Sequence, residues 1–134
     1  MAKIMLIVVG VLIAGVLLLI SPFVYDGFRS ASQRRSLQNR SDYPQIATAC
    51  ITLARAITNN STLISVTDPR IPALLQSLSP RHISASTNHV TMEFHGGFDH
   101  YGYSVRQTDI DPKQWAIFYY TKHGEKLLTT ITNN

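Results

Sequence analysis

The N-terminal part of the chain carries an uninterrupted apolar segment. No polar side chain occurs from Ile4 to Ile20, and no charged one from Ile4 to Tyr25. At 1.5 Å per residue, about 20 helical residues cross a hydrocarbon core that is about 30 Å thick. A single crossing segment must satisfy its backbone polar groups internally, which a helix does. The sequence therefore predicts a transmembrane helix over residues 1–25, with Pro22 closing the apolar run.

A cleavable signal peptide is the alternative interpretation of this segment. Such a peptide has an apolar core of about 7–15 residues, followed closely by a small-x-small cleavage site. Here the apolar core runs from Ile4 to Ile20, and the bulky residues Phe23, Val24 and Tyr25 stand where small ones would be needed. These features favour an uncleaved anchor. Within it, Gly10-x-x-x-Ala14 is a spacing of small residues that lets two helices approach closely.

The formal net charge of +4 belongs to the first forty residues. Residues 1–40 hold five basic residues against one acidic residue, whereas residues 41–134 hold seven of each. A nucleic-acid-binding domain needs a positive surface for phosphates, so the balanced domain at 41–134 argues against nucleic acid as a partner.

Residues 26–40 predict a basic juxtamembrane stalk, because Ser, Arg and Gln dominate and too few apolar side chains occur to bury a face. Arginines next to a membrane gain about 1 kcal/mol each from anionic headgroups. The predicted membrane-surface contacts are Arg29, Arg34, Arg35 and Arg40. A partner-docking role for this segment is the alternative.

The orientation of the anchor follows from the same arginines. Positive flanks favour the cytoplasmic side, which places the domain at 41–134 in the cytoplasm. The opposite orientation stays open, because a short N-terminus bearing Lys3 is itself positive. The single cysteine, Cys50, excludes a disulfide within the chain.

Two amphipathic helices are expected at the start of the soluble domain, residues 41–134. The first begins at Ser41-Asp42-Tyr43-Pro44, where a capping residue and a first-turn proline precede helical periodicity, and ends at Asn59-Asn60. Its apolar side comprises Ile46, Cys50, Leu53 and Ile57, which makes Cys50 a buried, unreactive thiol. The second opens at Asp68-Pro69 and presents Ile71, Leu74, Leu75 and Leu78.

From His82 onward the apolar period changes from helical to two, which is typical of strands. A short β-like segment precedes the second helix at 63–66, and further strands are expected near 83–85, 90–95, 101–106, 115–120 and 127–131. Short turns between them indicate antiparallel pairing. The predicted fold class is α+β: an N-terminal transmembrane helix, then two helices packed on a four- to five-stranded antiparallel sheet.

Register within the central hairpin follows from keeping apolar side chains on one face. Pairing Met92 with Val105 and Phe94 with Tyr103 achieves this, and it leaves residues 97–100 as the loop. The same pairing brings Glu93 diagonal to Arg106, within reach of an ion pair.

The hairpin carries the one chemically suggestive cluster of the chain. The candidate ligand- or partner-binding residues are His95, Gly96, Gly97, Phe98, Asp99, His100 and Tyr101. Two imidazoles and a carboxylate around a loop have the composition of a three-ligand metal site. The plainer interpretation is a turn, in which glycines supply the backbone freedom and the histidines are exposed. No metal, cofactor or catalytic residue is predicted.

Two functions remain compatible with these patterns. The first is a single-pass, membrane-anchored, non-catalytic protein, either an accessory subunit or a protein-binding module, with the bilayer and a protein partner or a second copy as its partners. The second is a small metal-dependent or histidine-using enzyme centred on the loop between His95 and His100. The aromatic residues of 101–120 are expected in the core and the sheet; the alternative is that some of them form an exposed recognition face.

Overall fold

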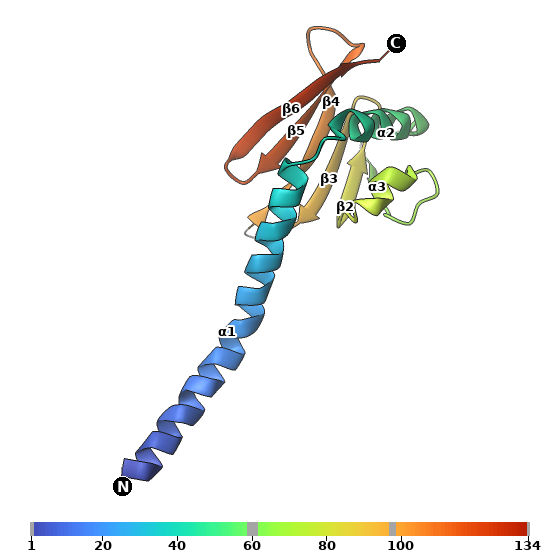
Figure 1. The fold of residues 1–134 in the computed structure, drawn as a ribbon. Coiled ribbons are helices and arrows are strands. Elements are labelled where there is room, and N and C mark those ends of the chain that lie inside the picture. Colours follow the sequence, from blue (N-terminus) through green and yellow to red (C-terminus); the bar gives the residue numbers. More distant parts are fainter. Residues whose placement is uncertain (1, 59–61, 97–98, 134) are drawn as a thin grey trace. The chain divides into compact units, whose positions relative to one another are not determined.

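A computed structural model describes residues 2–58, 62–96 and 99–133. The chain divides into two compact units, Met1–Asn39 and Arg40–Asn134, and each is described by itself (Figure 1). The first unit is one helix and the second is an α+β domain.

Helix α1 runs without a break over Ala2–Gln38 and contains Pro22 in its interior. A proline has no N–H to donate to the carbonyl four residues earlier, which here is that of Leu18. The hydroxyl of Ser21 donates to this carbonyl instead, at 3.2 Å, so the carbonyl keeps a partner. The apolar run and the basic segment that follows it are therefore parts of one continuous helix. Its Lys3–Gln38 portion, with a peak mean hydropathy of 3.1, is long and apolar enough to cross a membrane.

The domain contains a six-stranded, fully antiparallel sheet whose strands are in chain order from β1 to β6. The strands are β1 (Thr62–Ile64), β2 (His82–Ala85), β3 (His89–His95), β4 (Tyr101–Gln107), β5 (Gln114–Thr121) and β6 (Gly124–Thr132). The α+β class is confirmed, but the predicted count of four to five strands is too low. The two shortest strands, β1 and β2, pair with each other, and such short segments are recognisable as strands only once their partner is known.

Two helices lie against the same face of this sheet (Figure 1). Helix α2 covers Tyr43–Ala56, with Pro44 in its first turn as expected. It ends before the predicted stop at Asn59-Asn60, which lies outside the described residues. Its buried side chains are Ile46, Ala47, Cys50, Ile51, Leu53 and Ala54.

Helix α3 spans only Ala73–Ser77, so the prediction that it opens at Asp68-Pro69 is wrong. Asp68 instead closes a turn: its carboxylate accepts the backbone N–H of Arg70 at 2.9 Å and the guanidinium of Arg70 at 2.7 Å. Pro72 then disfavours helical geometry at Ile71, so the helix begins only after this proline. The side chain of Ile71 is nevertheless buried, as the apolar pattern indicated.

The core lies between α2 and the sheet face that it covers, here called the core face. Tyr43 of α2 packs edge-on against Tyr103 of β4, with ring centroids 6.2 Å apart, and Phe94 packs against the same ring at 5.5 Å. Four of the predicted aromatic core residues, namely Tyr101, Tyr103, Trp115 and Tyr119, are at most 2% exposed. Cys50 is fully buried as predicted, and burial raises the pKa of its thiol.

The register of the β3–β4 hairpin differs from the prediction by two residues. Met92 pairs with Tyr103 and Val90 with Val105, and a bulge between Glu93 and His95 precedes the loop. A shift of two residues leaves every side chain on its own face, so the apolar pattern cannot distinguish these registers. The predicted ion pair between Glu93 and Arg106 is absent as a consequence, because the two residues are no longer diagonal neighbours.

Candidate functional site

The hairpin cluster predicted from the sequence lies at the end of the β3–β4 pair. His95 is the last residue of β3 and Tyr101 the first of β4, and their rings stack with centroids 5.8 Å apart at 6° between planes. Tyr101 belongs to the core at 1% exposure, whereas the side chain of His100 is 51% exposed. Gly97 and Phe98 lie outside the described residues.

The titratable side chains of this cluster each have a different neighbour. His100 Nδ1 lies 3.3 Å from Glu93 Oε2, and Asp99 Oδ1 lies 3.7 Å from the ammonium of Lys122 at the β5–β6 turn. Among the described residues, no three His, Cys, Asp or Glu side chains gather as a metal site would require. The cluster therefore forms one polar contact, His100 with Glu93, and one ion pair, Asp99 with Lys122, while the ring of His95 stacks on that of Tyr101.

Two further side chains complete this end of the hairpin. Arg81 and Glu93 both lie over Gly96, where a Cβ would meet Glu93 Oε1 at 2.9 Å and Arg81 Nη1 at 3.2 Å. The backbone N–H of Arg81 also donates to the carbonyl of Glu93 at 2.7 Å. Sequence reasoning missed Arg81, because β2, the strand that follows it, could be placed beside the hairpin only after the pairing of β2 with β3 was known.

The sheet face opposite α2 is here called the outer face. Successive side chains of a regular strand point alternately to this face and to the core. The outer face carries Ser84, His89, Thr91, Glu93, Gly102, Ser104, Arg106, Ala116, Phe118 and Tyr120. Phe118 and Tyr120 are the two aromatic residues of 115–120 that lie here, half-buried, and not in the core.

A histidine–hydroxyl cluster occupies the centre of the outer face. His89 Nε2 lies 2.9 Å from Ser104 Oγ and 3.1 Å from Thr91 Oγ1. Burial lowers the pKa of His89, and the nearby guanidinium of Arg106 lowers it further. The neutral imidazole is thereby favoured. According to its tautomer, Nε2 either donates a hydrogen bond to one of the two hydroxyls or accepts one from it.

A second cluster lies beside it on β4, β5 and β6. Arg106 donates to both carboxylate oxygens of Glu125, at 3.2 and 2.9 Å, and its guanidinium lies 4.2 Å from the centre of the Phe118 ring. A cavity of about 260 Å³ opens next to this pair and extends to the β4–β5 loop at Ile110, which is 93% exposed. The outer face thus combines charged, aromatic and hydroxyl groups, with most charged groups already engaged by neighbours.

Tyr120 and Gly102 shape the outer face near the hairpin. A Cβ on Gly102 would come within 2.0 Å of the Met92 carbonyl and 2.7 Å of the Tyr120 hydroxyl, so only glycine fits there. Burial raises the pKa of Tyr120 to about 12, assisted by the carboxylate of Glu93. The tyrosine stays a neutral phenol at physiological pH.

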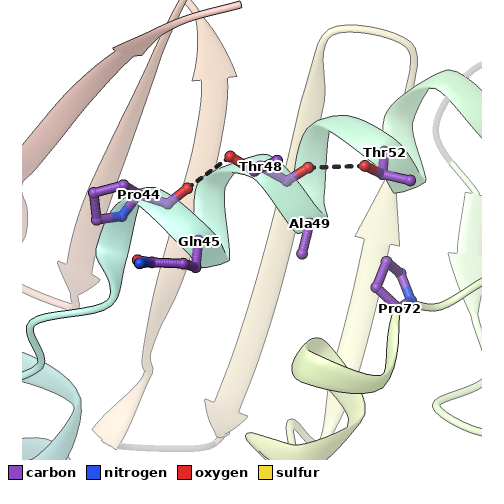
Figure 2. A pocket seen from close by; sticks show the side chains of 6 residues that line it. All are labelled: Pro44, Gln45, Thr48, Ala49, Thr52 and Pro72. Carbon is purple, nitrogen blue, oxygen red and sulfur yellow. Dashed lines mark hydrogen bonds between the residues drawn. The ribbon is translucent and has the colours of Figure 1, made fainter.

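A groove of about 420 Å³ follows the solvent side of α2 (Figure 2). It is lined by Pro44, Gln45, Thr48, Ala49, Thr52 and Pro72. The hydroxyl of Thr48 donates to the carbonyl of Pro44 at 2.9 Å, and that of Thr52 to the carbonyl of Thr48 at 3.0 Å. Because both hydroxyls bond back to the helix, the groove is largely apolar despite its threonines.

The four arginines predicted at the membrane surface fall in two units. Arg29, Arg34 and Arg35 lie on α1, within one continuous helix. Arg40 belongs to the domain, and its guanidinium binds both oxygens of Asp42, each at 2.7 Å. This contact holds the pKa of Asp42 below its ordinary value. The charge of Arg40 is thereby paired within the domain.

No family model, no curated protein and no solved structure matches this chain.

Proposed function

We propose that this protein is a single-pass, membrane-anchored, non-catalytic protein that presents a small α+β domain at the membrane surface, as an accessory subunit or protein-binding module. The observation that carries the proposal is the apolar surface of α1. Its most apolar stretch has none of its residues buried, and Leu18, Leu19 and Phe23 are 73%, 74% and 81% exposed.

The free energy of burying such a surface supports a bilayer location. Transferring a large aliphatic or aromatic side chain from water to an apolar phase gains about 1.5–3 kcal/mol. Water-soluble proteins rarely expose a contiguous apolar patch beyond a few hundred Å². The Ser21–Leu18 hydrogen bond adds to this argument, because an unpaired carbonyl next to Pro22 would be costly in lipid.

The continuity of α1 refines the proposed headgroup contacts. A helix rises 1.5 Å per residue, so Arg29 stands about 6 Å beyond Tyr25 along the axis and Arg35 about 15 Å. The interfacial layer on each side of the hydrocarbon is about 5–8 Å thick. Arg29 therefore reaches phosphate groups directly, whereas Arg34 and Arg35 act on an anionic surface over a longer distance. Arginines on this flank favour a cytoplasmic domain.

The half-buried outer face supports a binding role. It offers aromatic and arginine side chains, which are enriched at protein interfaces. Two cavities adjoin it, one lined in part by Leu63 and Thr91 and the other in part by Arg106 and Phe118. The described loop side chains His100 and Asp99 are each engaged by a separate neighbour, Glu93 and Lys122, which favours recognition over catalysis at this end.

Membrane fractionation tests the anchor. The full chain, carrying an epitope tag at each end, is expected to stay in the membrane pellet through alkaline carbonate and high salt and to be released by detergent. Both tags are expected on a species of full length. A shortened chain that lacks the N-terminal tag and appears in the soluble fraction would show a cleaved signal peptide and contradict the proposal.

The orientation is tested separately with thiol chemistry. Ile110→Cys places an accessible thiol on the domain, and a membrane-impermeant maleimide applied to intact cells is expected not to reach it until the membrane is opened. Labelling before permeabilisation would place the domain outside. Cys50 contributes no background in the folded chain, because it is fully buried.

A further inference from the structure

The two edges of the sheet differ in how well they are protected from further pairing. Edge strand β1 has three residues, a length too short to template another strand. Edge strand β6 has nine residues, Gly124–Thr132, and within the described part of the chain the sheet pairs it with β5 alone. An open edge of this length presents a row of backbone donors and acceptors.

The hydrogen-bond pattern identifies which residues of β6 present those groups. The N–H of Asn133 donates to the carbonyl of Lys113 at 2.8 Å, which marks a directly bonded position between the strands. Bonded positions alternate in an antiparallel pair, so Ile131 and Thr129 face β5 as well. The backbone groups of Thr130 and Thr132 therefore point away from β5, and both residues are exposed. Within the part of the chain that the structure describes, the Thr130 carbonyl accepts one long contact, 3.5 Å from the Thr129 hydroxyl.

The outer half of β6, residues 129–132, has none of the devices that natural edges use. Charges stand at Glu125 and Lys126, and the pairing steps from Thr129 to Leu127 opposite Ile117 and Phe118, so a bulge at Leu128 separates these charges from the outer half. From Thr129 to Thr132 the sequence Thr-Thr-Ile-Thr has no charge and no proline and consists of residues that favour strands. This half is suited to continue the sheet.

We propose that the outer half of β6 pairs antiparallel with β6 of a second copy of this chain, around a two-fold axis at Thr130, so that two sheets become one. In this register Thr130 faces Thr130 of the second copy and Thr129 faces Ile131. Threonine pairs and threonine–isoleucine pairs are favourable across strands. Glu125 and Lys126 fall at or beyond the ends of the paired segment, so no like charges meet.

A second copy is the occupant that the rest of the chain favours. An anchor confines copies to two dimensions and raises their effective concentration, so a short strand pair suffices. The Gly10-x-x-x-Ala14 spacing in α1 allows close approach of two helices in the same membrane. The inference rests on the proposed anchor in one respect, namely the raised effective concentration of the copies. The fractionation experiment tests the anchor independently of the pairing.

Cysteine crosslinking of the full chain in its membrane tests the register. Thr130→Cys is expected to form a disulfide dimer under mild oxidation, because directly bonded residues have Cα atoms about 5.5 Å apart, within the range a disulfide spans. Ile110→Cys, at a fully exposed loop position, is the control for random collisions and is expected to stay monomeric. Equal crosslinking of both variants would overturn the proposal.

Two substitutions then separate pairing from folding. Thr130→Pro removes the outward N–H and leaves the bonds to β5 intact, whereas Thr130→Val keeps this N–H. In detergent, the proline variant is expected to raise the dimer dissociation constant at least about 10-fold, with the valine variant near the parent chain. Thr130→Lys, an exposed change that places like charges across the axis, is expected to act like proline. Unchanged dimerisation in both, or a parent chain that is monomeric in its membrane, would refute the pairing.

Discussion

The imidazole Nε2 of His89 lies 2.9 Å from the hydroxyl of Ser104, across the β3–β4 pair at the centre of the outer face. Ser104 is only 3% exposed, although no helix of the domain packs on this side of the sheet in the part that the structure describes. Ser104 pairs across the sheet with Thr91 and Phe118, and the hydrogen bond with His89 satisfies its buried hydroxyl.

This contact predicts a pH dependence of stability. The pKa of His89 is lower in the folded chain than its ordinary value of 6.5, because burial and Arg106 disfavour the imidazolium; Glu125 opposes this weakly. Below about pH 6.5 the unfolded chain binds a proton that the folded chain does not, so stability falls as pH drops. Thermal unfolding of the full chain in detergent at pH 7.5 and 5.5 is expected to show this loss.

The variant His89→Gln is expected to make the loss between these pH values smaller, since it removes the titrating group. His123→Gln, at an exposed turn position, controls for the loss of one histidine. An identical pH dependence in the parent chain and in His89→Gln would contradict this assignment.

The close approach at Gly102 predicts a large effect of a single methyl group. In Gly102→Ala the new Cβ would lie 2.0 Å from the Met92 carbonyl, a backbone atom that cannot turn aside. Overpacking of this kind costs about 1–3 kcal/mol. The midpoint of thermal unfolding is expected to fall, by about 4–8 °C per kcal/mol for a domain of this size.

Gly96→Ala is the matched control for this substitution, because the added methyl would meet only the mobile ends of Glu93 and Arg81. Its midpoint is expected to stay close to that of the parent chain. An equal fall of the unfolding midpoint in both variants would contradict this. It would mean that the backbone around Gly102 shifts to accommodate the methyl group.

Burial of Cys50 predicts slow thiol chemistry. The side chain is fully buried on the core side of α2, and burial raises the pKa of its thiol, so little thiolate forms. A maleimide is expected to label the parent chain only at the rate of unfolding, and rapidly once denaturant is added. Ile110→Cys serves as the reference for an accessible thiol. Rapid labelling of Cys50 under native conditions would show that α2 detaches readily.

The pair formed by Arg106 and Glu125 predicts a modest coupling. Both side chains are 41% exposed, and exposed pairs contribute about 0.2–1 kcal/mol. A double-mutant cycle with Arg106→Ala and Glu125→Ala is expected to give a coupling in this range that shrinks in high salt. Arg106→Ala alone is expected to cost more than Glu125→Ala, because it also removes the contact with Phe118. A coupling of zero would mean that the loss of stability in Arg106→Ala comes from the contact with Phe118 and not from the ion pair.

Several features of the fold were predictable from local patterns. The apolar face of α2, the alternation of β3 and the strand near 115–120 each depend on spacing along a single segment. The length of α3 was not predictable in this way. A helix start at Asp68 competes with the turn that Asp68 closes with Arg70, and Pro72 also disfavours it. The helix start and the turn need different backbone geometries at the same residues, so only one of them can form. The apolar side chains of the segment would be buried in either case, so their spacing does not decide between the two.

The candidate site was predictable only in composition. The sequence placed His95, Asp99 and His100 in one loop, but their neighbours, Tyr101, Lys122 and Glu93, come from strand positions set by register. The cluster of His89 with Ser104 was missed for the same reason, since the two are 15 positions apart in the chain.

The sequence by itself determined that an apolar helix precedes an electrically balanced α+β domain, because the periodicity and charge of a segment need no knowledge of its partners. The tertiary structure decided the register of β3 against β4, the recruitment of β1 as a sixth strand and the exposure of β6 as a long open edge. A shift of two residues preserves the face of every side chain, so only packing, such as the approach of Gly102 to Met92, selects among the alternatives.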